Sequence, residues 1–165
     1  MNLARVFDRE ATVLDLLGGD RDHTILELLK VLEDGGHLNS RHRDEILLAL
    51  LKRERSSSTG IGRGIALPHI KTDYMDEIRG AIGISREGLD FDSQDGLKVH
   101  VVFLFLTPTW AVQQHLQLMS LLGRLIQNAG FLDQLRSAER EHDVHLLLQR
   151  AEQFIDPPAS DHPAR

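Results

Sequence analysis

The sequence has no cysteine, and this absence excludes several kinds of chemistry at once. Disulfide bridges, thiolate metal sites and cysteine nucleophiles all need a thiol group that this chain does not have. Basic residues are also scarce relative to acidic ones: 19 lysines and arginines against 25 aspartates and glutamates give a formal net charge of −6. A nucleic-acid binder needs an excess of lysine and arginine for the phosphate backbone, so no nucleic-acid partner is expected.

Long apolar runs are missing as well. Residues 1–6 lack the apolar stretch of a signal peptide, and no later segment is long enough to span a bilayer. We therefore expect a cytoplasmic protein without membrane insertion. Prolines are few and unevenly distributed: three of the five lie in residues 156–165, which have no apolar period and are predicted to form a flexible tail.

What the chain does contain is a series of short apolar segments with helical or strand spacing. Thr24 and Glu27 have the spacing of a capping box for a first helix, and Ser40 can cap a second. The predicted helices are 24–34, 40–53, a long segment from 112, and 141–154. The predicted strands are 65–67, 81–84 and 99–106.

The alternation of strands and helices predicts an α/β fold. We expect a single domain over residues 1–155, in which a small mixed β-sheet is flanked by helices on both faces, followed by the tail at 156–165. The segment 99–106 is almost continuously apolar, which is typical of a strand covered on both faces.

The most informative segment is residues 58–69, which ends in a histidine. Alternate glycines, beginning at Gly60, free the backbone to approach a ligand, and consecutive N–H groups in such loops form concavities that bind anions. Ser58 and Thr59 add hydroxyl groups. The pattern is compatible with phosphate binding, but it is neither a dinucleotide fingerprint nor a P-loop, and a glycine-rich segment is more often only a tight connection.

His69 follows a predicted strand, at the kind of strand end where ligands of α/β proteins tend to bind. Neutral imidazole is both a good nucleophile and a good leaving group near pH 7, which suits phosphoryl transfer.

His115 shares a helical stripe with Leu118 and should point toward the sheet end, either as a core-edge histidine or as a donor to a phosphoryl oxygen. Arg53 ends the preceding helix, either as a surface arginine or as a phosphate ligand.

Taken together, these residues resemble the IIA components of the bacterial phosphoenolpyruvate-dependent phosphotransferase system. The similar branch is the fructose/mannitol type, which includes nitrogen-regulatory members. The resemblance covers about residues 5–150. It rests on Arg-Glu-Arg at 53–55, Ser-Thr-Gly-Ile-Gly at 58–62, Gly-Ile-Ala-Leu-Pro-His at 64–69 and the later His115-Leu116.

The resemblance implies a role for each of these residues. His69 is expected to accept a phosphoryl group on Nε2 from a histidine phosphocarrier protein (HPr/NPr-like), with His115 as a neighbouring donor and Arg53 as a positive charge. The loop residues Ser58, Thr59 and Gly60 are expected to surround the phosphoryl group. No cofactor or metal ion is implied. The recipient is either a IIB component in sugar uptake or, in the nitrogen-type role that the loop favours, a regulated target protein.

Two positions depart from the family pattern, and two alternative functions stay open. Ile70 replaces a small residue and is expected to affect partner docking, whereas His100 replaces an acidic residue and is expected to have a structural consequence. One alternative is a regulatory interaction domain in which His69 is vestigial. The other is a metal-binding hydrolase, suggested by His142 and His145 at helical spacing, although no third ligand is evident.

Overall fold

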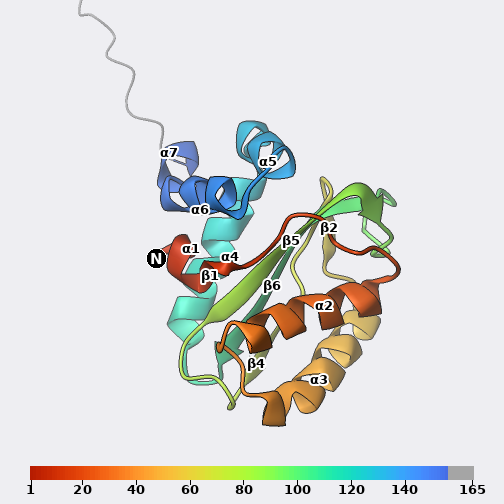
Figure 1. The fold of residues 1–165 in the computed structure, drawn as a ribbon, viewed down its shortest axis with the longest axis vertical. Coiled ribbons are helices and arrows are strands. Elements are labelled where there is room, and N and C mark those ends of the chain that lie inside the picture. Colours follow the sequence, from red (N-terminus) through yellow and green to blue (C-terminus); the bar gives the residue numbers. More distant parts are fainter. Residues whose placement is uncertain (156–165) are drawn as a thin grey trace, which may run out of the picture.

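A computed structural model describes residues 1–155, and the predicted tail at 156–165 lies outside the described residues. The strands are β1 (Phe7–Val13), β2 (Gly60–Gly62), β3 (Ile65–Ala66), β4 (His69–Thr72), β5 (Arg79–Leu89) and β6 (Val99–Pro108). The helices are α1 (Leu3–Val6), α2 (Arg21–Asp34), the 3-10 turn η1 (Ser40–His42), α3 (Arg43–Ser56), α4 (Val112–Ile126), α5 (Ala129–Arg136), α6 (Glu141–Gln149) and α7 (Glu152–Ile155). The strands form one mixed sheet in the order β1-β5-β6-β3-β2, and β4 also pairs with β6 (Figure 1).

Strand β6 organises the sheet because it has neighbours along both of its edges. It runs antiparallel to β5 on one edge and parallel to both β3 and β4 on the other. Its side chains alternate between the two faces of the sheet and enter two separate cores. These are Val101, Phe103 and Phe105 in one core and Val102, Leu104 and Leu106 in the other.

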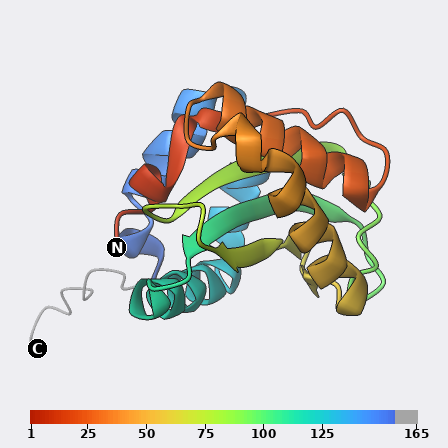
Figure 2. The ribbon, with the colours of Figure 1, turned by 90° about the horizontal axis from the view of Figure 1, so that it is seen from below.

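Helices cover both faces of the sheet, as the sequence predicts (Figures 1 and 2). On the α2/α3 face, these two helices bury leucines and isoleucines against the sheet. On the opposite face, which we call the α4 face, α4 packs together with α5 and α6. Leu118, Leu122 and Leu125 of α4 are each at most 1% exposed. Full burial of such a side chain stabilises the fold by roughly 1.5–3 kcal/mol, so the position of α4 is firmly fixed.

The predicted capping of the first two helices is wrong. Asp20 caps α2 by accepting the N–H of His23, while Thr24 is buried inside the helix and donates its hydroxyl to the Asp20 carbonyl. Glu27 accepts the N–H of Leu17 instead of reaching back to the helix start. Asn39 caps η1, and α3 begins only after that turn.

Several elements of the structure are missing from the sequence prediction. Strands β1, β2 and β4 and helices α1 and α5 were not anticipated, and the predicted helix at 141–154 divides into α6 and α7. Strand β1 has charged residues within its run, Asp8, Arg9 and Glu10, which mask its apolar signal. Within the described residues, no helix is long and apolar enough to cross a membrane.

Candidate functional site

The predicted acceptor, His69, is the first residue of β4. Strands β3 and β4 pair with the same edge of β6, one after the other, and β3 ends at Ala66. Between them, the carbonyl of Pro68 accepts the N–H of Phe105. His69 lies opposite Phe105 in the register, and the two rings are stacked, with centroids 4.9 Å apart and planes inclined by 5°. The half-buried imidazole therefore lies against a fixed aromatic surface on the α4 face.

The two ring nitrogens of His69 have different environments. Nδ1 lies 2.6 Å from the carbonyl oxygen of Leu67. Because a carbonyl only accepts hydrogen bonds, Nδ1 carries the proton of the neutral ring, which leaves the lone pair on Nε2. Burial lowers the pKa of His69; the bond to Leu67 opposes this, and the positive charge of Arg53 adds to it. The site thus favours a neutral imidazole with a nucleophilic Nε2.

His115 lies beside His69, as the helical stripe predicts. Its ring centroid is 5.5 Å from that of His69, and it is 8% exposed in the first turn of α4. Its Nδ1 is 3.0 Å from Oγ1 of Thr107, a residue near the end of β6. Burial lowers the pKa of His115, and so do the charges of His69 and Lys71. The structure therefore brings together the two histidines that the sequence singled out.

The predicted phosphate loop contacts this site through a chain of hydrogen bonds. The N–H of Thr59 donates to Glu54 Oε1 at 2.7 Å, and the Thr59 hydroxyl donates to the same carboxyl group. The Thr59 carbonyl accepts the N–H of Leu67, whose own carbonyl holds His69. Gly60 donates its N–H to Ser58 Oγ. The N–H and hydroxyl donors of Thr59, and the N–H of Gly60, are therefore already engaged within the protein.

Glu54 was missed by the sequence analysis, although it is central to that chain of hydrogen bonds. It is 1% exposed, and its negative charge raises the pKa of His69. Glu54 follows Leu50 by four residues on the buried stripe of α3, so helical spacing was the signal that could have found it, although the arginines on either side obscure that signal. The reason for its burial becomes evident when the following residues fold back to bring Thr59 against the end of α3.

Two cations act on the paired histidines. Arg53 is exposed in the last turn of α3, where Nη1 donates to the Ser57 carbonyl at 3.0 Å, and its charge lowers the pKa of His69. Lys71 lowers the pKa of both His69 and His115. It follows His69 by two residues in β4, so both side chains are on the same face of the strand. This alternation is the signal that could have identified Lys71 from the sequence.

The two departures from the family pattern lie away from the histidine ring. Ile70 packs into the core of the α2/α3 face, because neighbouring residues of a strand point to opposite faces. The Ile70 side chain therefore lies on the opposite face of β4 from the His69 ring, and its effect on partner docking stays a prediction. His100 has the expected structural role: its Nδ1 bonds the Ser85 carbonyl at 2.9 Å across the β5/β6 pair.

Three apolar side chains close to His115 in the chain are exposed. Trp110, Val112 and Leu116 are 67%, 50% and 64% exposed, and they lie immediately before or within the first turns of α4, which carries His115.

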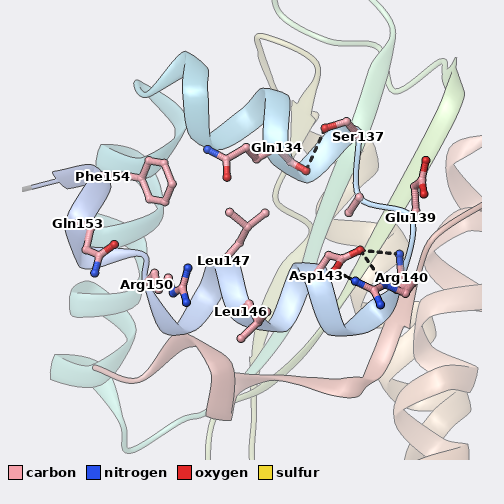
Figure 3. Close-up of a pocket in the computed structure, with 11 residues that line it drawn as sticks. Gln134, Ser137, Glu139, Arg140, Asp143, Leu146, Leu147, Arg150, Gln153 and Phe154 are labelled. Atoms are coloured by element: carbon pink, nitrogen blue, oxygen red, sulfur yellow. Dashed lines mark hydrogen bonds and ion pairs between the residues drawn. The ribbon is translucent and has the colours of Figure 1, made fainter.

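Figure 3 shows a pocket elsewhere, between α5, α6 and α7, and none of the predicted site residues lines it. Within residues 1–155, no group of three or more potential metal ligands is found.

Comparison with known proteins gives consistent results. The chain matches the family described as "Phosphoenolpyruvate-dependent sugar phosphotransferase system, EIIA 2" over residues 5–151. It is 36% identical over 121 residues to the fructose-specific EIIA component of Haloferax volcanii, which covers 73% of this chain and 77% of the relative. It is 34% identical over 144 residues to the fructose-specific EIIABC component of Bacillus subtilis, covering 87% of this chain but only 22% of that longer protein.

Solved structures agree with this similarity. The crystal structure of the nitrogen regulatory protein IIA-Ntr from Neisseria meningitidis superposes with a TM-score of 0.76 at 26% identity, over 88% of this chain and 97% of that one. Fold and sequence together thus define a component of the phosphoenolpyruvate-dependent phosphotransferase system. The chain belongs to the EIIA type 2 family, and this membership supports a phosphocarrier role through a phosphohistidine.

Proposed function

We propose that His69 accepts a phosphoryl group on Nε2 from a histidine phosphocarrier protein (HPr/NPr-like) and later passes it on or carries it as a signal. The observation that carries this proposal is the bond between Nδ1 and the Leu67 carbonyl, which leaves Nε2 as the nucleophile. The lowered pKa keeps that nitrogen unprotonated at neutral pH. The cytoplasmic location expected from the sequence is part of the proposal.

In the proposed transfer, the phosphoryl group moves from the donor protein to Nε2 of His69, and the charged groups around this imidazole stabilise it. The donor's phosphohistidine approaches in line with Nε2, the donor P–N bond breaks as the bond to His69 forms, and the phosphoryl group passes through a loose transition state. Arg53 and Lys71 supply positive charge, and His115 donates to a phosphoryl oxygen. Both ends of the transfer are imidazole nitrogens, so the scheme assigns no step to a metal ion or cofactor.

In this scheme the loop at Ser58, Thr59 and Gly60 shapes the wall of the site. Thr59 already donates to Glu54, and Gly60 to Ser58. These donors would bind phosphoryl oxygens only if their present hydrogen bonds were exchanged. We therefore assign the first contacts of the phosphoryl group to His115 and the two cations, and we assign to the loop the task of holding Leu67 against His69.

The exposed apolar surface at Trp110, Val112 and Leu116 fits a protein partner better than a small substrate. Exposed apolar side chains at the start of the helix that carries His115 would let a second protein dock and exclude water from the transfer. For the recipient we favour the nitrogen-type role, in which phosphorylation regulates a target protein; the alternative is a IIB component. Neighbouring genes discriminate between them: a sugar permease favours transport, whereas a sigma-54-type regulator favours regulation.

The test is incubation of the purified protein with phosphoenolpyruvate, the general first enzyme of the system and a histidine phosphocarrier protein. We expect one acid-labile phosphoryl group per chain, which is absent in His69→Ala. His142→Ala is the matched control, because His142 is an exposed histidine on α6 and should label like the wild type. If the wild type does not label, or His69→Ala labels equally well, His69 is not the acceptor and the vestigial-site alternative is favoured.

A further inference from the structure

Thr107 stands behind the second histidine. It is completely buried near the end of β6, opposite Lys71 in the β4/β6 pair. Its Oγ1 lies 3.0 Å from Nδ1 of His115, while the His115 ring faces His69 at a centroid distance of 5.5 Å. Thr107 therefore touches one ring nitrogen of His115, Nδ1, and leaves Nε2 of that ring for another partner.

A hydrogen bond between a hydroxyl group and an imidazole nitrogen can run in either direction. If Nδ1–H of His115 donated, the hydroxyl proton of Thr107 would need another acceptor. Among residues 1–155, His115 Nδ1 is the one hydrogen-bond partner of Thr107 Oγ1. A buried hydroxyl proton without an acceptor is costly, so the favoured direction has Thr107 donating to an unprotonated Nδ1.

We propose that Thr107 is a positioning residue that holds neutral His115 in the Nε2–H tautomer. A neutral imidazole has a single N–H, and this arrangement puts it on the nitrogen opposite Thr107. The tautomer does not depend on the proposed function. The partner of that N–H does, because in the proposed function it is an oxygen of the phosphoryl group on His69. The lowered pKa of His115 agrees with a ring that stays neutral at physiological pH.

The two histidines then have opposite tautomers, and each is set by one neighbour. The Leu67 carbonyl accepts from Nδ1 of His69 and so leaves a lone pair on Nε2. The Thr107 hydroxyl donates to Nδ1 of His115 and so leaves a proton on Nε2. One ring is prepared as the nucleophile, and the other as a hydrogen-bond donor that does not need to be charged. Of the two neighbours, only the Thr107 hydroxyl is a side-chain group, so a substitution can remove it, whereas the Leu67 carbonyl belongs to the backbone.

The test measures the tautomer directly in the unphosphorylated protein. Long-range hydrogen–nitrogen NMR correlations near pH 8, above the ordinary histidine pKa, distinguish the two neutral forms. We expect His115 to be Nε2–H in the wild type and in Thr107→Ser, and to show a measurable Nδ1–H population in Thr107→Val. His69 serves as the internal reference and should stay Nδ1–H throughout. Thr24→Val is the matched control, because Thr24 is equally buried but lies in α2, a different helix from the one that carries His115.

Phosphoryl transfer provides the second readout. Thr107→Val should accept phosphate about 3- to 10-fold more slowly, the size expected for one lost hydrogen bond, and Thr107→Ser should restore the rate. The proposal is overturned if wild-type His115 is Nδ1–H, or if Thr107→Val keeps both a pure Nε2–H tautomer and the wild-type rate. The wild-type spectrum decides even if the valine variant does not fold. If no protein accepts phosphate, the proposed function fails, and the NMR result still decides the role of Thr107.

Discussion

Replacing Glu54 tests the chain of hydrogen bonds that leads from α3 to His69. In Glu54→Ala, the N–H and the hydroxyl of Thr59 lose their acceptor at a position where Thr59 is only 5% exposed. Each buried donor left without a partner costs about 1–3 kcal/mol, so we expect a loss of roughly 3–5 kcal/mol in the free energy of unfolding. Glu54→Gln keeps one oxygen for the Thr59 N–H, and its expected loss is only about 1–2 kcal/mol.

Denaturant unfolding followed by circular dichroism measures these losses. Glu87→Gln is the matched control, because Glu87 is an exposed glutamate of β5, and a surface substitution of this kind should change stability by less than about 0.5 kcal/mol. A double-mutant cycle of Glu54→Gln with Thr59→Val should give a coupling energy of about 1 kcal/mol, since the two side chains are in direct contact.

The same variants report on the site. Because the negative charge of Glu54 raises the pKa of His69, Glu54→Gln should lower that pKa further in an NMR titration. The other charges that act on His69 are Arg53 of α3 and Lys71 of β4 itself, and both stay unchanged in this variant. Equal stability of Glu54→Ala and Glu87→Gln, or a rise in the His69 pKa when the glutamate charge is removed, would show that Glu54 does not hold Thr59 and His69 in this way.

Five further predictions concern the histidines and β4. Because the pKa of His69 is lowered from 6.5, the rate of phosphate acceptance should fall with a midpoint below pH 6.5; a midpoint above 6.5 contradicts this. The folded-state pKa values of His69 and His115 are both lowered, so the unfolded chain binds more protons than the folded one as the pH falls. Their contribution to stability is therefore complete above about pH 6.5 and declines as the pH falls toward the folded pKa. Denaturant unfolding across this range measures the decline. His115→Ala should slow transfer by about 10-fold or more and leave the label on His69, whereas loss of folding would favour a purely structural role. Lys71→Gln should slow the acceptance of phosphate and raise the pKa of both histidines. Ile70→Ala should lower the free energy of unfolding by about 1–3 kcal/mol without changing the tautomer of His69.

The fold class was predictable because its strongest signals are periodic. The apolar run at 99–106 became the central strand β6, and the stripe of His115 and Leu118 became the buried face of α4. Short elements such as β4 could not be predicted in this way. Four residues that begin just after a proline have no period of their own, and they form a strand only because β6 offers a free edge.

The candidate site was predictable where residues share a motif and not where tertiary contacts decide. His69 and His115 were named from the sequence, and the structure brings their rings together. Glu54 was missed because the charged residues at its helix end obscure its place on the stripe of Ile46 and Leu50. Thr107 was missed because a threonine at the end of an apolar strand is ordinary in sequence. Their roles arise only from the side chains that folding brings within hydrogen-bond distance.

The most direct test of the account is the position of the phosphoryl group on the phosphorylated protein. Nitrogen-15 NMR of the imidazole rings, combined with peptide mapping under alkaline conditions that preserve phosphohistidine, identifies both the residue and the nitrogen. The account predicts that the group is on Nε2 of His69, because the Leu67 carbonyl occupies Nδ1. A phosphoryl group on Nδ1 of His69, or on His115, would contradict it.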